Sequence, residues 1–174
     1  MLPLLGGCGF TLRETPPMPF ARIALSGFAA RSPLATELRA RLAESVQVVD
    51  TPAQAEVVLH ALSDRRQRSV VASTGAGQVR ELQLRLGFEF RLSSPGGREL
   101  IAPIDLLLSR DMSYSETVAL GKAQEEGELY AAMQADIVQQ VLTRLARVDL
   151  RLGTASRAPA AAAPPAAPAP VSGR

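Results

Sequence analysis

The 174-residue chain has a single cysteine, Cys8, so it cannot form a disulfide within itself. It has no tryptophan and only 4% aromatic residues, so aliphatic side chains must supply most of any core. It also has one histidine, His60, and no Gly-x-Ser-x-Gly sequence, and thus lacks the usual partners of a histidine metal site or a nucleophile elbow. We interpret His60 as structural and expect no catalytic residue, metal or cofactor.

Lysine is nearly absent as well, because Lys122 is the only one, and the net charge is just +2. Nucleic-acid-binding proteins concentrate positive charge on one surface, so this small excess argues against that class of partner. The arginines do cluster in the sequence, and guanidinium groups suit phosphate because they form paired hydrogen bonds with it. The candidates for a phosphorylated ligand are Arg65, Arg66, Arg68, Arg80, Arg85 and Arg91. The alternative is a solvated sheet face balanced by glutamates.

One stretch, Gln78 to Leu92, alternates between apolar and polar residues. From Leu82 onward every even-numbered position is apolar, and a period of two places the two sets on opposite faces of a strand. We therefore predict a strand with one face in the core and the other open to water or to a polar partner. The alternation fails at Gln78 and Arg80. We expect this end, with the turn at Gly75 to Gly77, to project beyond whatever covers the core.

Turn residues place this strand in an antiparallel meander. A strand is expected from Ala55 to Leu62, and its continuation would carry the chain through the arginine cluster to the glycine turn. After a Pro-Gly turn at Ser94 to Gly97, a third strand is expected from Glu99 to Asp111. Pro103 cannot donate to a ladder, so it belongs at a sheet edge or a bulge.

The remaining elements are a strand from Arg22 to Phe28, a helix from the Ser32 cap to about Glu44 and a strand from Val46 to Asp50. A long helix is expected after Thr117, with cap signals at Ser113-x-x-Glu116 and at Thr117. Its apolar stripe comprises Tyr130, Met133, Ile137, Val141, Leu145 and Val148. The order predicts an α+β two-layer sandwich, in which two helices pack on one face of a mixed, roughly four-stranded sheet with long central hairpins.

The ends of the chain differ from this predicted domain, which spans residues 21–150. Residues 1–8 end in Leu-Gly-Gly-Cys, the form of a lipoprotein processing site, and we interpret them as a truncated signal peptide with Cys8 as the acylated residue. Gly9, rather than aspartate, follows the cysteine, which favours the outer membrane. Residues 9–20 are expected to form a tether. Residues 151–174 are rich in alanine and proline and are expected to be a disordered tail.

Four stretches together resemble one family of proteins. They are Gly7–Arg13, Gly77–Leu82, Arg110–Thr117 and Met133–Leu145. The family is LptE, the outer-membrane lipoproteins of lipopolysaccharide assembly, and the resemblance covers roughly Leu5 to Val148.

The resemblance implies a two-helix, four-stranded sandwich that sits as a plug inside the β-barrel of LptD, in a heterodimer. It implies help in assembling that barrel and in delivering lipopolysaccharide to the outer leaflet. The expected partners are therefore LptD, lipopolysaccharide and the outer membrane, reached from its periplasmic side through the lipid anchor.

Two other classes of protein fit parts of the sequence. A generic envelope lipoprotein adaptor would share the anchor and the sandwich and would differ only in its partner. An enzyme would need paired carboxylates, and Asp105 and Asp111 flank an apolar run without a companion base. We therefore do not expect an enzyme.

Overall fold

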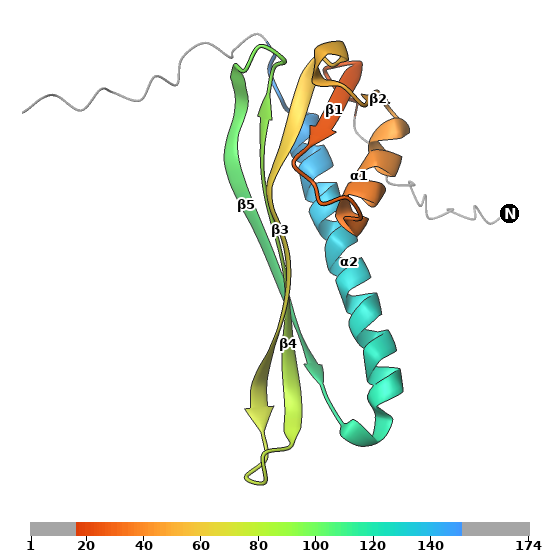
Figure 1. Cartoon of the computed structure of the whole chain (residues 1–174), viewed down its shortest axis with the longest axis vertical. Helices are drawn as coiled ribbons and strands as arrows, with labels where there is room; N and C mark the ends of the chain where they lie inside the picture. The colour runs from red at the N-terminus through yellow and green to blue at the C-terminus, as the bar shows by residue number, and fades with distance from the viewer. Residues whose placement is uncertain (1–16, 151–174) are drawn as a thin grey trace, which may run out of the picture.

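A computed structural model describes residues 17–150, which form one sheet and a layer of helices (Figure 1). The strands are β1 (Arg22–Ser26), β2 (Gln47–Val49), β3 (Val57–Ser73), β4 (Val79–Ser93) and β5 (Glu99–Ser113). Their order across the sheet is β2-β1-β3-β4-β5. Strand β1 is parallel to both of its neighbours, and the other pairs are antiparallel. The predicted α+β sandwich with a mixed sheet is confirmed, with a short fifth strand.

Two hairpins of similar turn geometry join the three long strands. At the first turn Thr74 N donates to Gln78 O (2.8 Å) and Gly77 N donates to Thr74 O (2.9 Å). The second turn has the same two bonds, from Ser94 to Arg98 and from Gly97 to Ser94. Gly77 and Gly97 have φ values of 80° and 86°, a left-handed conformation that favours glycine and closes hairpins of this length. The predicted meander is therefore confirmed.

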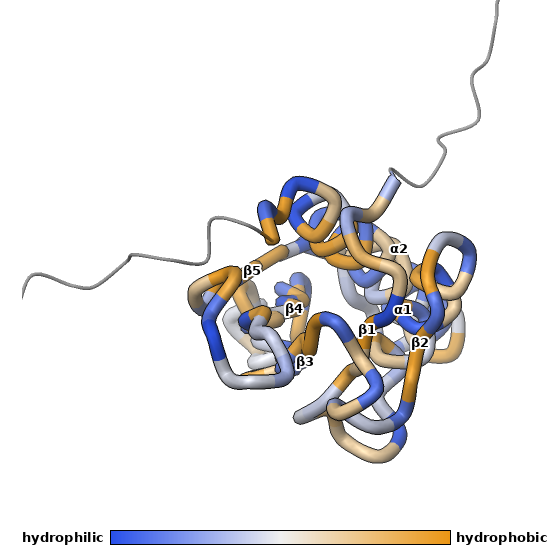
Figure 2. Tube along the Cα trace, turned by 90° about the horizontal axis from the view of Figure 1, so that it is seen from above, coloured by the Kyte–Doolittle hydropathy of each residue, from blue (hydrophilic) through white to orange (hydrophobic). Residues whose placement is uncertain are grey.

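Two α-helices cover one face of this sheet, and they are neighbours both in the side view of Figure 1 and in the view from above in Figure 2. Helix α1 (Pro33–Ala43) begins as predicted, because Ser32 Oγ accepts a hydrogen bond from Ala35 N (3.1 Å) and Pro33 occupies the first turn. Helix α2 (Ala119–Leu145) follows a 3-10 turn, η2 (Glu116–Val118), and no side chain caps its start. Neither predicted cap signal therefore forms a cap. A second 3-10 turn, η1 (Pro52–Gln54), precedes β3.

The core lies between the helices and the even-numbered side chains of β4 from Leu82 onward. These side chains are at most 5% exposed, and they are Leu82, Leu84, Leu86, Phe88, Phe90 and Leu92. The whole predicted stripe of α2 is buried, as are three leucines of α1. The few aromatic residues are concentrated, because Phe28 stacks on Phe88 (centroids 5.7 Å apart) and Phe88 on Phe90 (5.6 Å). The alternation of β4 thus correctly predicts the buried face.

Register shifts interrupt both ladders of β4. In the ladder with β3 they lie between Ala61 and Ser63 and, near the hairpin, between Val70 and Ala72 and between Ala72 and Ser73. In β5 a shift lies opposite Phe90 and Leu92, where the residues paired on β5 are Ile104 and Ile101. Pro103 is therefore at a bulge on an edge strand, as expected for a residue without an N–H. This shift places Ile101 opposite Leu92, on the core side, so Ala102 is exposed although it shares the even-numbered apolar pattern of Ile104, Leu106 and Leu108.

The predicted signal peptide and acylated Cys8, most of the tether and the alanine-proline tail lie outside the described residues. They remain predictions.

Candidate interaction surfaces

The face of β4 opposite the helices is polar and open. Its side chains are Glu81, Gln83, Arg85, Glu89 and Arg91, of which the two arginines are exposed and the others are half-buried. Cross-strand register places polar residues beside them, such as Gln67 and Ser109 on either side of Arg85. We call this surface, formed by the odd-numbered residues of β4 and their neighbours on β3 and β5, the open face.

A notch marks the middle of the open face. Gly87 lacks a side chain and is flanked in register by Arg65 on β3 and Leu107 on β5. With Arg85 and Asp105, these residues border a hollow of about 220 Å³. Arg85 Nε donates to Gln83 Oε1 (2.7 Å), a neutral partner. No ion pair involves either arginine within the described residues, so both guanidinium groups remain available to an anion.

The structure divides the predicted arginine cluster between the two faces. Arg66 and Arg68 pair in register with Leu86 and Leu84, whose side chains face the helices. Both arginines are exposed at the edge of the layer between the sheet and the helices, and their side chains contact helix α2.

Arg66 lies over the ring of Tyr130, 5.2 Å from its centroid, and donates to Gln134 Oε1 (2.6 Å). Arg68 pairs with Glu126 at 3.1 Å. A phosphate at either guanidinium would have to share or displace these partners.

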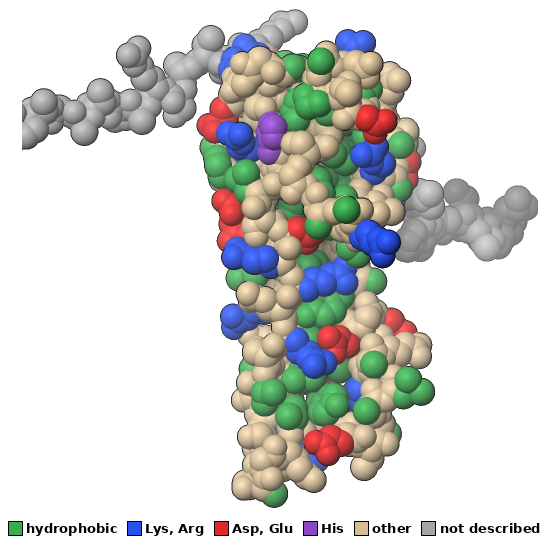
Figure 3. Space-filling model, viewed as in Figure 1, with side chains coloured by type: hydrophobic (Ala, Val, Ile, Leu, Met, Phe, Trp, Pro, Cys, Tyr) green, Lys and Arg blue, Asp and Glu red, His purple; other side chains and the backbone are tan. Residues whose placement is uncertain are grey.

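The last two predicted arginines lie near opposite ends of β4. Arg91 is on the open face, opposite His60. Arg80 is exposed near the glycine turn, beside a hollow that is also bordered by Ser115, Glu116 and Thr117. The six candidates therefore do not form one patch, and Figure 3 shows basic side chains spread along the molecule.

A band of hydrogen bonds, not predicted from the sequence, joins β3 to both helices. Gln134 Nε2 donates to Glu37 Oε2 (2.5 Å), so Arg66, Gln134 and Glu37 form a chain across the layer. Tyr130 donates its hydroxyl to Gln67 O (2.7 Å). Burial, and then the negative charge of Glu126, raises the pKa of Tyr130, which keeps this donor protonated. We call this set of contacts the polar belt.

Apolar side chains are exposed at the end of the molecule beyond the polar belt. Four of the large ones are Val70 (54% exposed), Val71 (49%), Val118 (54%) and Leu120 (88%). They belong to β3, to η2 and to the first turn of α2, and hydrophobic atoms gather toward the lower end in Figure 3. The hairpin tip also projects past the helix, as predicted (Figure 1). We call this region the apolar end.

His60 links three strands on the open face. Its Nδ1 lies 2.8 Å from Ser26 Oγ on β1, and its Nε2 lies 2.9 Å from Ser93 Oγ on β4. Burial, and then the charge of Arg91, lowers the pKa of His60, which favours the neutral ring. These contacts agree with the structural role expected for it.

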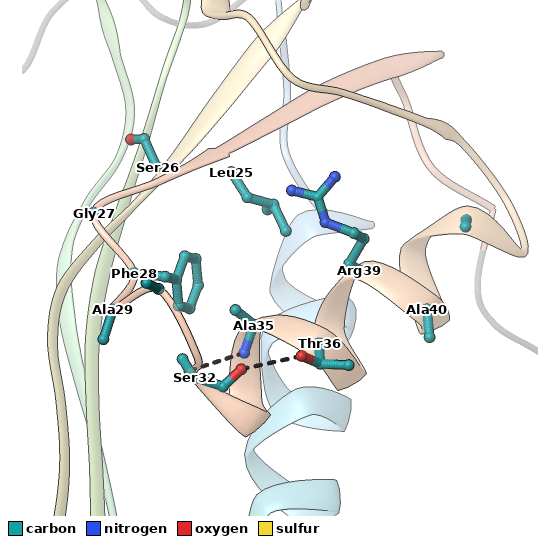
Figure 4. A pocket seen from close by; sticks show the side chains of 12 residues that line it. Leu25, Ser26, Gly27, Phe28, Ala29, Ser32, Ala35, Thr36, Arg39 and Ala40 are labelled. Atoms are coloured by element: carbon teal, nitrogen blue, oxygen red, sulfur yellow. Dashed lines mark hydrogen bonds between the residues drawn. The ribbon is translucent and has the colours of Figure 1, made fainter.

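A further hollow, of about 520 Å³, lies between the end of β1 and α1 (Figure 4). It is lined by Leu25, Phe28 and small side chains of α1 such as Ala35 and Ala40. Arg39, at its edge, pairs with Asp50 at 3.3 Å. This hollow offers apolar contact and no cluster of reactive groups.

The carboxylates considered for an enzyme are not close together. Asp105 and Asp111 are six residues apart on β5, about 20 Å along a strand. Asp105 lies opposite Glu89, while Asp111 accepts a hydrogen bond from Gln83 Nε2 (3.0 Å). Within residues 17–150 no three His, Cys, Asp or Glu side chains are grouped as metal ligands would be. No helix in this range is both long and apolar enough to span a bilayer.

Residues 20–145 match the profile of a family described as LptE, lipopolysaccharide-assembly. This match covers most of the chain and the whole sandwich. The chain belongs to the LptE family. Membership places it in lipopolysaccharide assembly rather than in a family of enzymes.

Solved structures agree with membership in the LptE family. The chain is 27% identical to lipoprotein B from Nitrosomonas europaea, with a TM-score of 0.68 over 79% of this chain and 90% of that one. It is 27% identical to the rare lipoprotein B from Shewanella oneidensis, with a TM-score of 0.60 over 72% of this chain and 93% of that one. A minor lipoprotein from Acinetobacter baumannii, at 24% identity and a TM-score of 0.61, shares the fold over 76% of this chain and 96% of its own. No curated protein matches the chain.

Proposed function

We propose that this LptE-family chain is anchored through Cys8 on the periplasmic side of the outer membrane. There it plugs the β-barrel of LptD, assists assembly of that barrel and binds lipopolysaccharide during delivery to the outer leaflet. The observation that carries this proposal is the contrast between the two faces of the sheet. The helices seal one face, while the other offers alternating charged side chains to a polar lumen.

The open face also supports binding of a phosphorylated lipid. Arg65 and Arg85 border the Gly87 notch from neighbouring strands, and neither is held in an ion pair within the described residues. Arg91 extends the charge along β4. Two guanidinium groups on one rigid sheet can contact one phosphate at a low cost in conformational freedom. Arg66, Arg68 and Arg80 stay in the proposal as flanking contacts near the apolar end.

The apolar end supplies the second chemistry that such a lipid needs. Arg68, Val70, Val79 and Leu82 border a hollow of about 350 Å³ there, beside Tyr114. Apolar surface next to a guanidinium group suits an acyl chain below a phosphate.

Co-purification is the primary test of this function. The full-length chain, tagged at its C-terminus, would be expressed with its cognate LptD and recovered from solubilised outer membranes. We expect LptD in equal molar amount. Recovery of a different envelope protein, with LptD absent, would favour the adaptor alternative. Mass spectrometry of the mature N-terminus would determine whether Cys8 is acylated.

A matched pair of triple variants tests lipopolysaccharide binding by the open face. The first replaces Arg65, Arg85 and Arg91 with serine. The control replaces Arg22, Arg39 and Arg41, whose exposed ion pairs contribute little to stability. Both variants change the net charge from +2 to −1 (2 − 3 = −1). We expect the first to weaken binding to lipopolysaccharide by about tenfold or more and the control to bind nearly as the parent does. Equal loss in both would mean that net charge alone governs binding.

A further inference from the structure

Strand β5 is the outer strand of the long hairpins, and its backbone can be oriented residue by residue. Tyr114 N donates to Arg80 O (2.8 Å) immediately beyond the pair formed by Glu81 and Ser113. Tyr114 and Arg80 are therefore a hydrogen-bonded pair, and because hydrogen-bonded and non-hydrogen-bonded pairs alternate along an antiparallel ladder, the adjacent pair of Glu81 and Ser113 is not hydrogen-bonded. The N–H and C=O of Ser113 therefore point away from β4.

The register is unbroken from the pair of Glu81 and Ser113 to the pair of Phe90 and Ile104. Every second residue of β5 in this range therefore points its backbone N–H and C=O away from β4, as Ser113 does. Five residues of β5 thus direct both backbone groups outward. They are Asp105, Leu107, Ser109, Asp111 and Ser113. Among the described residues, one side chain bonds to these outward backbone groups: Arg110 Nη1 donates to Ser109 O (3.2 Å).

Two of the features that usually prevent strand pairing, proline and a bulge, protect only the end of this edge near the Ser94 turn, at Pro103. The stretch from Ile104 to Ser113 has no proline, lysine or bulge, and its charged residues are Asp105, Arg110 and Asp111. Of these, Arg110 turns toward Asp136 of α2 (3.8 Å). Leu107 is 63% exposed.

We propose that the outer edge of β5, from Asp105 to Ser113, binds an extended segment of the outer-membrane barrel partner by adding it as a sixth strand. The strands of a closed barrel have no free edge, so the segment must lie outside the barrel's own ladder. Complementarity to β5 indicates the sequence of the bound segment. The segment carries a basic residue beside Asp105, because this carboxylate has no ion-pair partner within the described residues. It carries an apolar residue beside the exposed Leu107. This inference rests on the proposed function, because the partner is LptD.

Amide-resolved hydrogen exchange of the full chain, free and in its purified complex with LptD, tests the inference. The amides of the five outward residues should exchange quickly in the free chain and at least about tenfold more slowly in the complex. The even-numbered amides between Ile104 and Met112 bond to β4 and should be protected in both states. They are the internal control.

Two substitutions at one position separate the backbone from the side chain. Ser109→Pro removes an outward N–H, a change that an edge strand tolerates, whereas Ser109→Ala keeps it. We expect Ser109→Pro to lower the yield of LptD by about fivefold or more relative to Ser109→Ala. Thermal melting of the two free variants checks that both fold.

The outcomes distinguish this inference from the proposed function. If the complex forms and the outward amides exchange as in the free chain, the strand pairing is wrong and the proposed function stands. If LptD does not bind, both fail. If the outward amides of the free chain gain protection as its concentration rises, a second copy occupies the edge and the assignment to the barrel partner is wrong.

Discussion

Replacing Gly27 with alanine should destabilise the protein more than the same change at either hairpin glycine. Gly27 follows the last paired residue of β1 and has a φ of 81°. A methyl group added there would overlap the carbonyl oxygen of Ala61, and it would lie 3.2 Å from the carbonyl carbon. Ala61 is buried within β3 and pairs with Phe90 of β4, so its backbone cannot move aside without disturbing the sheet.

The magnitude follows from two separate costs. A left-handed conformation costs an alanine about 1–2 kcal/mol, and forcing atoms into a packed region costs about 1–3 kcal/mol more. Gly27→Ala should therefore lower the free energy of unfolding by about 2–5 kcal/mol. Gly77→Ala and Gly97→Ala carry only the first cost, because their φ values are 80° and 86° and nothing lies within 4 Å of the added atom.

Urea denaturation followed by circular dichroism would measure these differences. Alanine restricts the unfolded chain similarly at all three positions, so that contribution cancels in the comparison. The slopes of the transitions should agree, which would show that the native state remains as compact. A Gly27→Ala protein as stable as Gly77→Ala, within about 0.5 kcal/mol, would refute the close approach of β1 to β3.

Three further changes test individual contacts, each by urea denaturation. Tyr130→Phe removes the bond to Gln67 O and should cost about 1 kcal/mol; an unchanged midpoint would mean that this bond adds no stability. Ser32→Ala removes both the cap of α1 and the bond that Ser32 Oγ donates to Asp64 Oδ2 (2.6 Å), and should cost about 1–3 kcal/mol, most of which Ser32→Thr should restore. The pKa of His60 is lowered by burial and then by Arg91, so the unfolded chain binds the proton more readily and stability should fall as the pH drops below about 6.5. A His60→Asn protein with the same pH dependence would contradict this.

The alternation from Leu82 to Leu92 is enough to predict the buried face, because a period of two leaves one assignment for each side chain. The stripe of α2 is equally informative at a period of 3.6. In both elements the pattern that marks the core face lies within the element itself. Local sequence is therefore enough to predict which face of β4 and of α2 is buried.

The arginines show where local sequence is insufficient. Arg65, Arg66 and Arg68 are neighbours in the chain, so the sequence alone suggests one cluster. In a strand, adjacent residues face opposite ways, so Arg65 lies on the open face while Arg66 and Arg68 lie on the helix side. The bulge between Ala61 and Ser63 also changes which residues of β3 face the helices, from odd-numbered before it to even-numbered between it and Val70. A bulge depends on cross-strand partners, which the sequence of one strand does not specify.

The polar belt could not be predicted for the same reason. Gln134 lies on the buried side of α2, where its neighbours in the sequence are apolar. Its partners, Arg66 and Glu37, are 68 and 97 residues away. A helical pattern alone would treat a glutamine at such a position as an interruption of the stripe. Only the packing of three elements shows that its amide group is fully bonded.

The polar belt also separates two regions of the sheet that the helices cover to different extents. On one side of it both helices cover the sheet, and the leucines of α1 and the phenylalanines of β4 are buried. On the other side α2 continues without α1, and its first turns, which include Gly121, leave Leu120 exposed. Segments with few buried contacts open at low free energy. The exposed Val70, Val71, Val118 and Leu120 at this end are apolar surface that the chain's own helices leave uncovered. Such surface supports our proposal that acyl chains contact the apolar end, because burying it would be favourable.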